Sequence, residues 1–277
     1  MLESYFSNPD WAICFEHKTG QLPDMDFHLH ERFEIYFFIS GNVNYFIDRK
    51  VYPLKYGDLL VMNNHEIHKP SFLDNSKYER MVIHFDPSVT QIFQNEADLL
   101  RCFTERPTGE QNRVRLNDEQ IEEIMVLFKK LGKHQEDTTQ YGKILKLTSF
   151  IDLLVYINRL FQCPQKEEYS HIPEKLAPIL TFIDNNLDGD LSLGALEKQF
   201  YINASYLSRL FKKCIGSSIH EYIVYKRISK AKKLITEGLS ASEVCSLCGF
   251  NDFSNFSRMF KRTVGVTIRE YKMKAKI

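Results

Sequence analysis

The sequence lacks a net charge and a long hydrophobic run, and each absence narrows what the protein can be. Its 277 residues contain 36 Lys and Arg against 36 Asp and Glu, and 43% of them are apolar. This ordinary composition excludes collagen-like, coiled-coil and disordered classes. The longest apolar stretches, such as IYFFI and LLVYI, are far shorter than the ~18 residues that a membrane span needs. With no basic and then apolar leader at the N-terminus, we expect a soluble, cytoplasmic protein without a membrane partner.

The sequence also has few cysteines. Six in a chain of this length do not make a disulfide framework, which agrees with a reducing compartment. Cys245 and Cys248 form one CxxC pair. Without a second such pair or a nearby HxxxH pattern, this is a weak signal for zinc or redox chemistry. Two small buried residues on a helix are the simpler interpretation.

The zero net charge is a cancellation between two halves of the chain. Residues 1–170 hold 19 Lys and Arg against 26 Asp and Glu, a net −7, whereas residues 171–277 hold 17 against 10, a net +7. At ~100 to 200 residues per domain, the length predicts two domains. A basic half on a neutral chain points to a nucleic-acid-binding module.

The first half has the pattern of short strands separated by turns. Four segments are rich in aromatic and β-branched residues, as is typical of strands. These segments are 33–40, 43–49, 57–64 and 79–86. Their spacing predicts a small barrel or sandwich.

Helical patterning follows between about residues 118 and 161. The first helix is expected to begin at an Asn117-Asp118 cap and to end at Gly132, and the second to run from about 139 to 161. The second helix carries an apolar stripe made of Ile144, Leu147, Ile151 and Leu154. The stripe either pairs with its copy in a homodimer or packs on its own barrel. The polar segment 163–173, with a proline at each end, is the best candidate for an interdomain linker.

The basic half contains an internal repeat with an offset of 49 residues. SRLFKKCIG at 208–216 recurs as SRMFKRTVG at 257–265, and the dipeptide Glu-Tyr at 221 recurs at 270. Two copies are too few for a solenoid, which needs about three. The repeat therefore predicts two similar small modules side by side.

In each copy a second helix is expected to open after an N-cap, at Asn203 or Asp252. Apolar residues at helical spacing pack inward and leave polar and basic side chains on the outer face. The outer faces are expected to carry Ser205, Ser208, Arg209 and Lys212 in the first copy and Phe253, Ser254, Ser257, Arg258 and Lys261 in the second.

These outer faces suit helices placed in a DNA major groove. Arg pairs bidentately with guanine, Ser donates or accepts, and Phe253 can contact a thymine methyl group. Phosphate contacts are expected from Lys212, Lys213, Lys261 and Arg262. A solvated amphipathic helix is the alternative for either copy alone, but the duplication within the basic half favours DNA.

The repeat resembles the signatures of the AraC/XylS transcription regulators. Residues 248–272, CGFNDFSNFSRMFKRTVGVTIREYK, are similar to the second helix-turn-helix signature, and residues 191–235 to the first one plus the linking helix. The resemblance covers about 100 residues and implies two recognition helices in successive major grooves, ~34 Å apart, joined by a linking helix over Ser218–Leu234. Glu197 and Tyr201 depart from the family's small residue and glycine, which predicts a first module with looser docking or less specificity.

The N-terminal half carries a second pattern, HxHxxxE, formed by His28, His30 and Glu34, followed after six residues by Gly41. On an extended strand these three residues have the same parity and point to the same side of the sheet. The pattern resembles the first metal-binding motif of cupin barrels. The second cupin motif is less complete: Gly57 and His68 match, whereas Asn63, His65 and Phe72 stand in place of Pro, Gly and Asn.

We expect these residues to line a small-molecule pocket with aromatic walls and few polar groups. The predicted ligand-binding set is His28, His30, Glu34, Tyr36, Phe38 and His68. Imidazoles and a carboxylate also suit a divalent metal, so His28, His30, Glu34 and His68 are either metal ligands or polar lining, and no cofactor is required. Arg80 and His84 are weaker candidates, and His84 is more simply a core or surface histidine.

The sequence thus predicts an α+β protein of two domains. Residues 1–165 form a cupin-like β-barrel sensor with dimerisation helices, 166–173 a linker, and 174–277 an all-α double helix-turn-helix domain. We expect a ligand-responsive, sequence-specific DNA-binding transcriptional regulator, not an enzyme, that senses a sugar or other small polar metabolite. The expected partners are double-stranded DNA, the effector, a second copy of the chain and RNA polymerase. The alternative is a metal-dependent cupin enzyme, an oxygenase or isomerase, fused to a DNA-binding domain.

Overall fold

The computed structural model describes residues 13–20, 27–161 and 172–274. The strands are β1 (Cys14–Gly20), β2 (Phe33–Ser40), β3 (Val43–Ile47), β4 (Lys50–Pro53), β5 (Leu59–Met62), β6 (His68–Phe72), β7 (Tyr78–Phe85) and β8 (Arg113–Val114). The helices are the 3₁₀ helix η2 (Pro87–Phe93), α2 (Arg101–Thr104), α3 (Asp118–Lys133), α4 (Gln140–Phe161), α5 (Ala177–Asn185), α6 (Leu193–Phe200), α7 (Ala204–Ile215), α8 (Ile219–Thr236), α9 (Ala241–Leu247), α10 (Phe253–Val264) and α11 (Ile268–Lys274).

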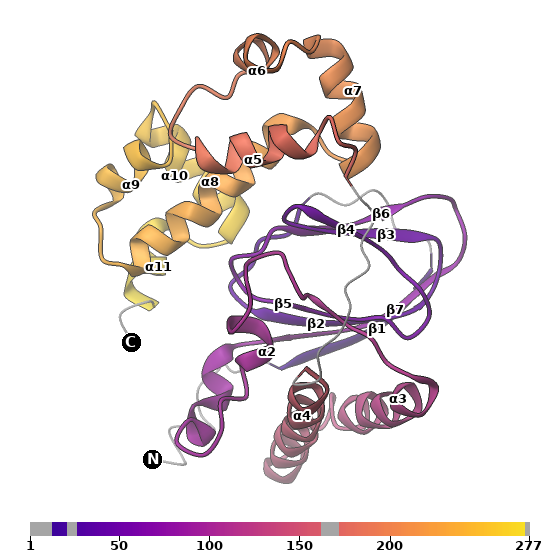
Figure 1. Cartoon of the computed structure of the whole chain (residues 1–277). Helices are drawn as coiled ribbons and strands as arrows, with labels where there is room; N and C mark the ends of the chain where they lie inside the picture. Colours follow the sequence, from indigo (N-terminus) through magenta and orange to yellow (C-terminus); the bar gives the residue numbers. More distant parts are fainter. Residues whose placement is uncertain (1–12, 21–26, 162–171, 275–277) are drawn as a thin grey trace.

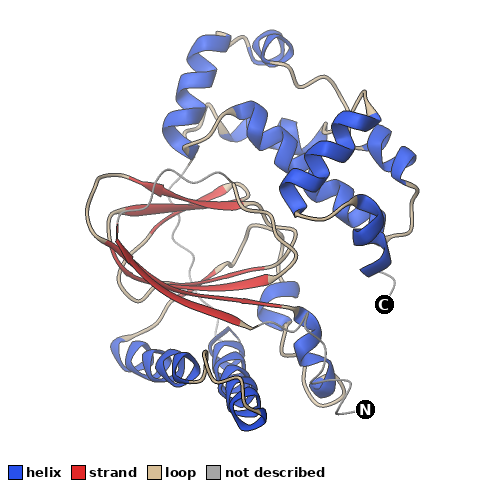
Figure 2. Ribbon diagram, turned by 180° about the vertical axis from the view of Figure 1, so that it is seen from behind, coloured by secondary structure: helices blue, strands red, loops and turns tan. Residues whose placement is uncertain are grey.

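The strands form two antiparallel sheets that face each other (Figures 1 and 2). One sheet has the order β1-β7-β2-β5-β8 and the other the order β4-β3-β6. Four strands, β2, β3, β5 and β7, lie where the sequence predicted them, and the other four were missed because they are short or polar. The predicted cupin-like domain is confirmed, and it consists of two separately paired sheets that do not close into one barrel among the described residues.

Both faces of the five-stranded sheet are buried, which explains why β2 reads as an almost continuous apolar run. Ile35 and Phe37 point outward and pack with Phe128 of α3 and Phe150 of α4. The two helices cover this face of the sheet (Figure 1). Asn117 caps α3, as predicted, in a capping box with Gln120.

The predicted apolar stripe of α4 packs largely against its own domain. Leu154 is fully buried, and Leu147 and Ile151 pack on the same core. Ile144 is exposed. The exposed apolar side chains of α4 also include Tyr141, Leu145 and Val155, which follow a different face of the helix. The stripe as a whole is therefore not a free dimerisation surface.

The inner faces of the two sheets meet in an aromatic core. Its members include Tyr36, Phe38 and Tyr78 from the five-stranded sheet and Tyr45 and Tyr52 from the three-stranded sheet. The outer face of the three-stranded sheet, by contrast, contributes Phe46 and Val51 to the core of the C-terminal helices. One thin sheet thus separates the interior of the sensor from the C-terminal domain.

The C-terminal helices form two helix-turn-helix modules, α6–α7 and α9–α10, connected by α8. Ser218 caps α8 in a capping box with Glu221, so the linking helix lies within two residues of its predicted bounds. Most of the predicted linker, residues 162–171, lies outside the described residues. Within the described part of the chain, no helix is long and apolar enough to cross a membrane.

Candidate functional site

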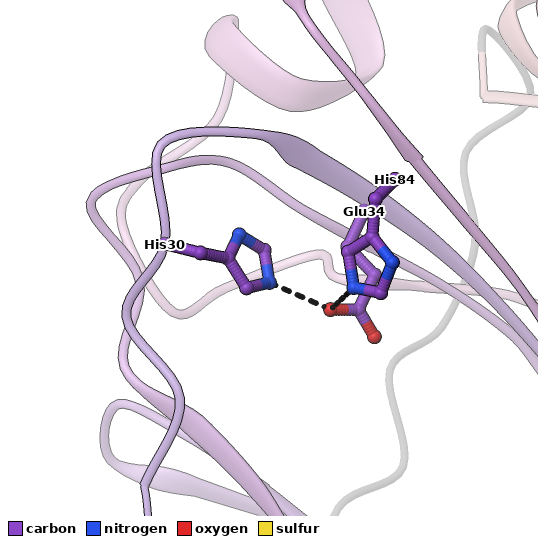
Figure 3. Close-up of side chains that lie close together, drawn as sticks. All are labelled: His30, Glu34 and His84. Atoms are coloured by element: carbon purple, nitrogen blue, oxygen red, sulfur yellow. Dashed lines mark hydrogen bonds and ion pairs between the residues drawn. The ribbon is translucent and has the colours of Figure 1, made fainter. Parts of the chain in front are cut away.

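Three imidazoles converge on one carboxylate oxygen at the end of the sensor sandwich. The Nε2 atoms of His30, His68 and His84 lie 2.9, 3.1 and 3.1 Å from Oε2 of Glu34. Figure 3 shows His30 and His84 on either side of the carboxylate. Glu34 and His68 are almost fully buried, and the other two imidazoles are half-buried.

The cluster differs from the predicted one in two residues. His84 on β7, the weaker candidate, lies opposite Glu34 on β2 and bonds to it, so it is a half-buried histidine with a hydrogen-bond partner in the cluster. His28 does not bond to Glu34; its ring packs edge-on against that of His68 at 5.5 Å. β2 begins only at Phe33, so the three residues do not share one strand. His28 and His30 nevertheless face the cluster, whereas Phe27 and Leu29, which alternate with them, pack on the C-terminal helices.

Burial and charge shift the pKa values of the cluster in opposite directions. Burial would raise the pKa of Glu34, but the charge of His68 and hydrogen bonds from three imidazoles hold it well below its ordinary value. Burial lowers the pKa of His28 to about 4, with a further contribution from His68. Burial also opposes the charged form of His68, yet the charge and hydrogen bond of Glu34 raise its pKa overall.

The second ring nitrogens restrict the proton arrangement. Nδ1 of His30 lies 2.7 Å from the Arg32 carbonyl oxygen, and Nδ1 of His68 lies 2.9 Å from that of Glu66. Because a carbonyl only accepts, each Nδ1 carries a hydrogen, and each Nε2 carries one only when its ring is charged. A ring whose Nδ1 donates to a backbone carbonyl, as in His30 and His68, can offer Nε2 to a metal ion once that atom has lost its hydrogen, which is how metal-ligating histidines are held.

The donor set therefore fits a divalent transition metal chemically. Among the described residues, His30, Glu34 and His84 bring their ligand atoms within 4.8 Å of one another. His68 is a fourth donor and bonds to the same carboxylate oxygen. The predicted His28 lies behind it, with its ring against that of His68. The same residues would equally bind the hydroxyl groups of a small molecule.

Tyrosines extend from this cluster into the interior. The Tyr45 hydroxyl donates to Glu34 Oε1 at 3.4 Å, and the Tyr36 and Tyr78 hydroxyls share a short hydrogen bond. The predicted Tyr36 and Phe38 both face this core and are almost fully buried. Tyr45 and Tyr78 were missed, although Tyr45 stands in the predicted strand 43–49 and Tyr78 directly before the predicted strand 79–86.

The second helix-turn-helix module gathers its predicted residues on one surface. Asp252 caps α10 by accepting from the backbone N–H groups of Ser254 and Asn255. An open surface hollow is lined by Phe253, Ser254, Ser257, Arg258, Lys261 and Arg262, the complete predicted set for this module. Arg258 additionally donates to the Asn255 side-chain oxygen at 3.2 Å.

The first module presents the corresponding residues on α7. Ser205, Arg209, Lys212 and Lys213 are exposed and Ser208 is half-buried. Tyr201 ends α6 in the left-handed conformation, φ 52°, and its side chain is 96% exposed. Glu197, the other departure from the family pattern, accepts from the Ala204 N–H at 3.3 Å and so supports the start of α7.

The CxxC pair is part of the helical core. Cys245 lies in α9 and Cys248 caps its C-terminus, and both are buried. Burial raises the pKa of the Cys248 thiol to about 12. A thiol of this kind is protonated at neutral pH and therefore unreactive.

Contacts between the two domains were not predicted from the sequence. Lys69 of β6 donates to the Gly216 carbonyl at 2.7 Å and to the Ser217 hydroxyl at 2.9 Å, at the C-terminus of α7. Lys232 of α8 is fully buried, where it donates to the carbonyl of His30 at 3.2 Å and to that of Asn64. It also pairs with Glu31 at 2.9 Å. In the sequence, the only sign of these contacts is that the two lysines stand among apolar residues.

Comparisons with known proteins match both domains of the chain. The pattern of an AraC-like ligand binding domain matches residues 10–138, and that of a helix-turn-helix domain matches residues 196–274. The transcriptional activator RhaR of Mannheimia succiniciproducens is 24% identical over 270 residues, covering 97% of this chain and 94% of that protein. RhaR of Cronobacter sakazakii is 25% identical over 248 residues, covering 88% and 86%. The crystal structure of ToxT from Vibrio cholerae aligns with 94% of this chain and 97% of that one, at 14% identity and a TM-score of 0.38.

Proposed function

The chain belongs to the AraC family of transcriptional regulators, with a ligand-binding domain and a DNA-binding helix-turn-helix domain, and on this premise we propose how its sensor controls its DNA contacts. An effector bound between the two sheets changes the position of α7 and α8 through the three-stranded sheet. A ligand shifts such an equilibrium only by its differential affinity for the two arrangements.

One observation supports this proposal most strongly. His68 and Lys69 are neighbours on β6, and their side chains point to opposite faces of the strand. His68 bonds to Glu34 inside the sensor, and Lys69 bonds to the end of α7 outside it. When effector binding moves His68, the neighbouring Lys69 moves with it. Because Lys69 is bonded to the end of α7, the first recognition helix is displaced as well.

A second connection runs through the segment before β2. The ring of His30 bonds to Glu34, while its carbonyl accepts from Lys232 of α8. Burial lowers the pKa of Lys232, although Glu31 opposes this shift. A buried ammonium group depends on each of its partners, so α8 responds to the position of this segment.

We propose that Arg209 and Arg258 read base edges in the major groove. Ser205, Ser208, Phe253, Ser254 and Ser257 complete the base-facing surfaces, and Lys212, Lys213, Lys261 and Arg262 contact phosphates. The exposure of these side chains and the hollow on α10 support this assignment.

We propose a sugar or another small polar metabolite as the effector. The polar groups His28, His30, Glu34 and His68 beside the aromatic Tyr36 and Phe38 support this class. The relatives named activators support a role in activation, with RNA polymerase as a partner. A homodimer through the exposed residues of α4, including Tyr141, Leu145 and Val155, is part of the same proposal.

We propose that the protein is not an enzyme, since its curated relatives are named as regulators. The competing function, a metal-dependent cupin enzyme with a DNA-binding tail, draws its support from the histidine and glutamate donors alone. If a divalent metal binds, His30, Glu34, His68 and His84 would hold it and it would polarise an effector hydroxyl group. The competing function requires turnover of a small substrate by the metal-loaded protein.

Mobility-shift and selection experiments on the full chain test this function. The unmodified protein is expected to select a DNA sequence from a random pool, and Arg209→Ala and Arg258→Ala are each expected to lose preference at different base pairs. Selection of no sequence, or unchanged preference in both variants, would contradict the assignment.

A further inference from the structure

A buried arginine in the sensor has no ionic partner within the described part of the chain. Arg80 on β7 is 9% exposed, and its Nη1 atom is buried without a hydrogen-bond partner. Among the described residues, its guanidinium group makes no ion pair, and its Cζ lies 5.2 Å from the centroid of the Tyr78 ring. Its charge also helps to lower the pKa of Glu16 on β1. A desolvated charge without a counterion destabilises a folded protein, so its presence calls for a role.

The strand register places Arg80 inside the sandwich. Tyr78, Arg80, Val82 and His84 alternate along β7 toward the interior, and Arg80 lies opposite Phe38 of β2. The same core contains Tyr36 and Tyr78, whose hydroxyls bond to each other. Arg80 therefore lies on the same inner surface as the histidine and glutamate cluster, four residues along β7 from His84.

The two carboxylates on this sheet face are already engaged. Glu34 accepts from three imidazoles, as described above. Glu16 on β1 pairs with Lys18 at 2.6 Å and is 41% exposed. Neither makes an ion pair with Arg80. The interior thus has a satisfied carboxylate at one end and an unsatisfied guanidinium at the other, with tyrosine hydroxyls between them.

We propose that Arg80 is the anion receptor of the sensor, and that the effector carries a carboxylate at the Arg80 end and hydroxyl groups toward Glu34 and its histidines. This inference rests on the proposed function and narrows its effector from a polar metabolite to a small hydroxy acid. A planar guanidinium presents two parallel N–H donors that match a carboxylate. One positive charge balances one carboxylate, whereas a phosphate dianion in a buried site needs more, and the nearby phenols donate only neutral hydrogen bonds.

Minimal probes test this site without knowledge of the effector's carbon skeleton. Acetate and acetamide have nearly the same shape, and only acetate is charged. With ionic strength held constant by chloride, acetate is expected to raise the melting temperature of the full chain more than acetamide does. Arg80→Met is expected to abolish the difference, and Arg80→Lys to retain part of it. Lys77→Met, which removes an exposed charge next to the start of β7, is the matched control and is expected to respond as the unmodified protein does.

Three outcomes would overturn the proposal. The first is an acetate effect that is no larger than the acetamide effect, or one that persists in Arg80→Met, as a general salt effect on the surface would. The second is a response to inorganic phosphate that exceeds the response to acetate and depends on Arg80, which would replace the carboxylate by a phosphate. The third is a loss of preference for acetate in the control variant.

The stability of the variant without any probe provides an independent test. If Arg80 waits for a ligand, Arg80→Met removes an unpaired buried charge and is expected to leave the melting temperature unchanged or higher. If the variant is less stable by several degrees, or fails to fold while Arg80→Lys folds, Arg80 has a carboxylate partner within the chain and is not a receptor. Arg80→Met is expected to retain DNA binding in mobility shifts, so failure of this inference is distinguishable from failure of the proposed function.

Discussion

The two helix-turn-helix modules share a sequence pattern but differ in what surrounds them. Each recognition helix ends at a glycine in the left-handed conformation, Gly216 with φ 78° and Gly265 with φ 85°. A side chain added at Gly216 would meet Lys69 and Ser71 of the sensor within 3.5 Å, whereas at Gly265 no described residue beyond its chain neighbours lies within 4 Å of the same position. We call the first module tied, because the end of its recognition helix contacts the sensor, and the second free, because the end of its recognition helix makes no such contact among the described residues. The second module meets the sensor through α11, where the Tyr271 hydroxyl bonds to Glu31.

The two recognition helices also differ at one matching position of the repeat. In the free module, Asn255 holds Arg258 by a hydrogen bond. At the matching position of the tied module stands Tyr206, whose ring has the ammonium group of Lys175 at 5.9 Å. From this difference we infer that the duplicated motif has divided its tasks, with α10 organised for DNA contact alone and α7 also coupled to the sensor.

The region that joins the sensor to the first module is expected to lose more stability in acid than the second module does. Burial, with Lys232 and Lys233 nearby, lowers the pKa of His65 to about 4. Between pH 6.5 and 4 the unfolded chain binds this proton and the folded chain does not, so the free energy of unfolding falls as the pH falls, by up to ~3 kcal/mol for this group. Denaturant unfolding across this pH range is expected to show a smaller fall in His65→Asn.

His28 contributes a similar dependence on pH, since burial lowers its pKa to about 4 as well. His65→Asn is therefore expected to lose only the part of the pH dependence of unfolding that His65 contributes. An identical pH profile in His65→Asn and the unmodified protein would show that the interface does not exclude the proton.

Replacing the arginine on each recognition helix tests which base pairs each module reads. Arg258→Ala and Arg209→Ala are each expected to lose ~1 to 3 kcal/mol of discrimination, at base pairs one helical turn apart. Selection from a randomised site, followed by sequencing, measures both positions in one experiment. Losses at the same base pairs would contradict the placement of the two helices in successive grooves.

The support of Arg258 by Asn255 predicts a further asymmetry between the modules. Asn255→Ala frees the guanidinium and is expected to lower discrimination by about 1 kcal/mol, the value of a typical hydrogen bond, at the base pairs that Arg258 reads. Tyr206→Ala changes no such bond and is the matched control in the tied module. An equal loss in both variants would mean that Asn255 has no special role.

Phosphate contacts should give the smallest and least selective effects. Lys212→Ala and Lys261→Ala are each expected to weaken binding to all sequences alike and to reduce the slope of log K against log salt by about one. Titration of specific and random DNA at several salt concentrations measures this slope. A change in base preference in either variant would reassign that lysine to base reading.

The sequence predicted the fold class and the two helices that carry the proposed DNA-binding residues, because both follow from local patterns. The cap at Asn117, the spacing of apolar residues in α10 and the repeat of Arg209 at Arg258 depend on near neighbours in the chain. His84 and Lys69 could not be assigned in this way. Their partners, Glu34 and Gly216, lie 50 and 147 residues away, and only the tertiary fold brings them together.

The central claim is that the sensor holds the first module through Lys69, and a footprint of Lys69→Met on DNA tests it most directly. Arg209→Ala and Arg258→Ala first identify which half-site belongs to which module. Lys69→Met removes a cation from the C-terminus of α7 together with its bonds to Gly216 and Ser217. The account predicts a change in affinity of about fivefold or more at the first half-site and none at the second. An equal change at both half-sites, or no change at either, would contradict it.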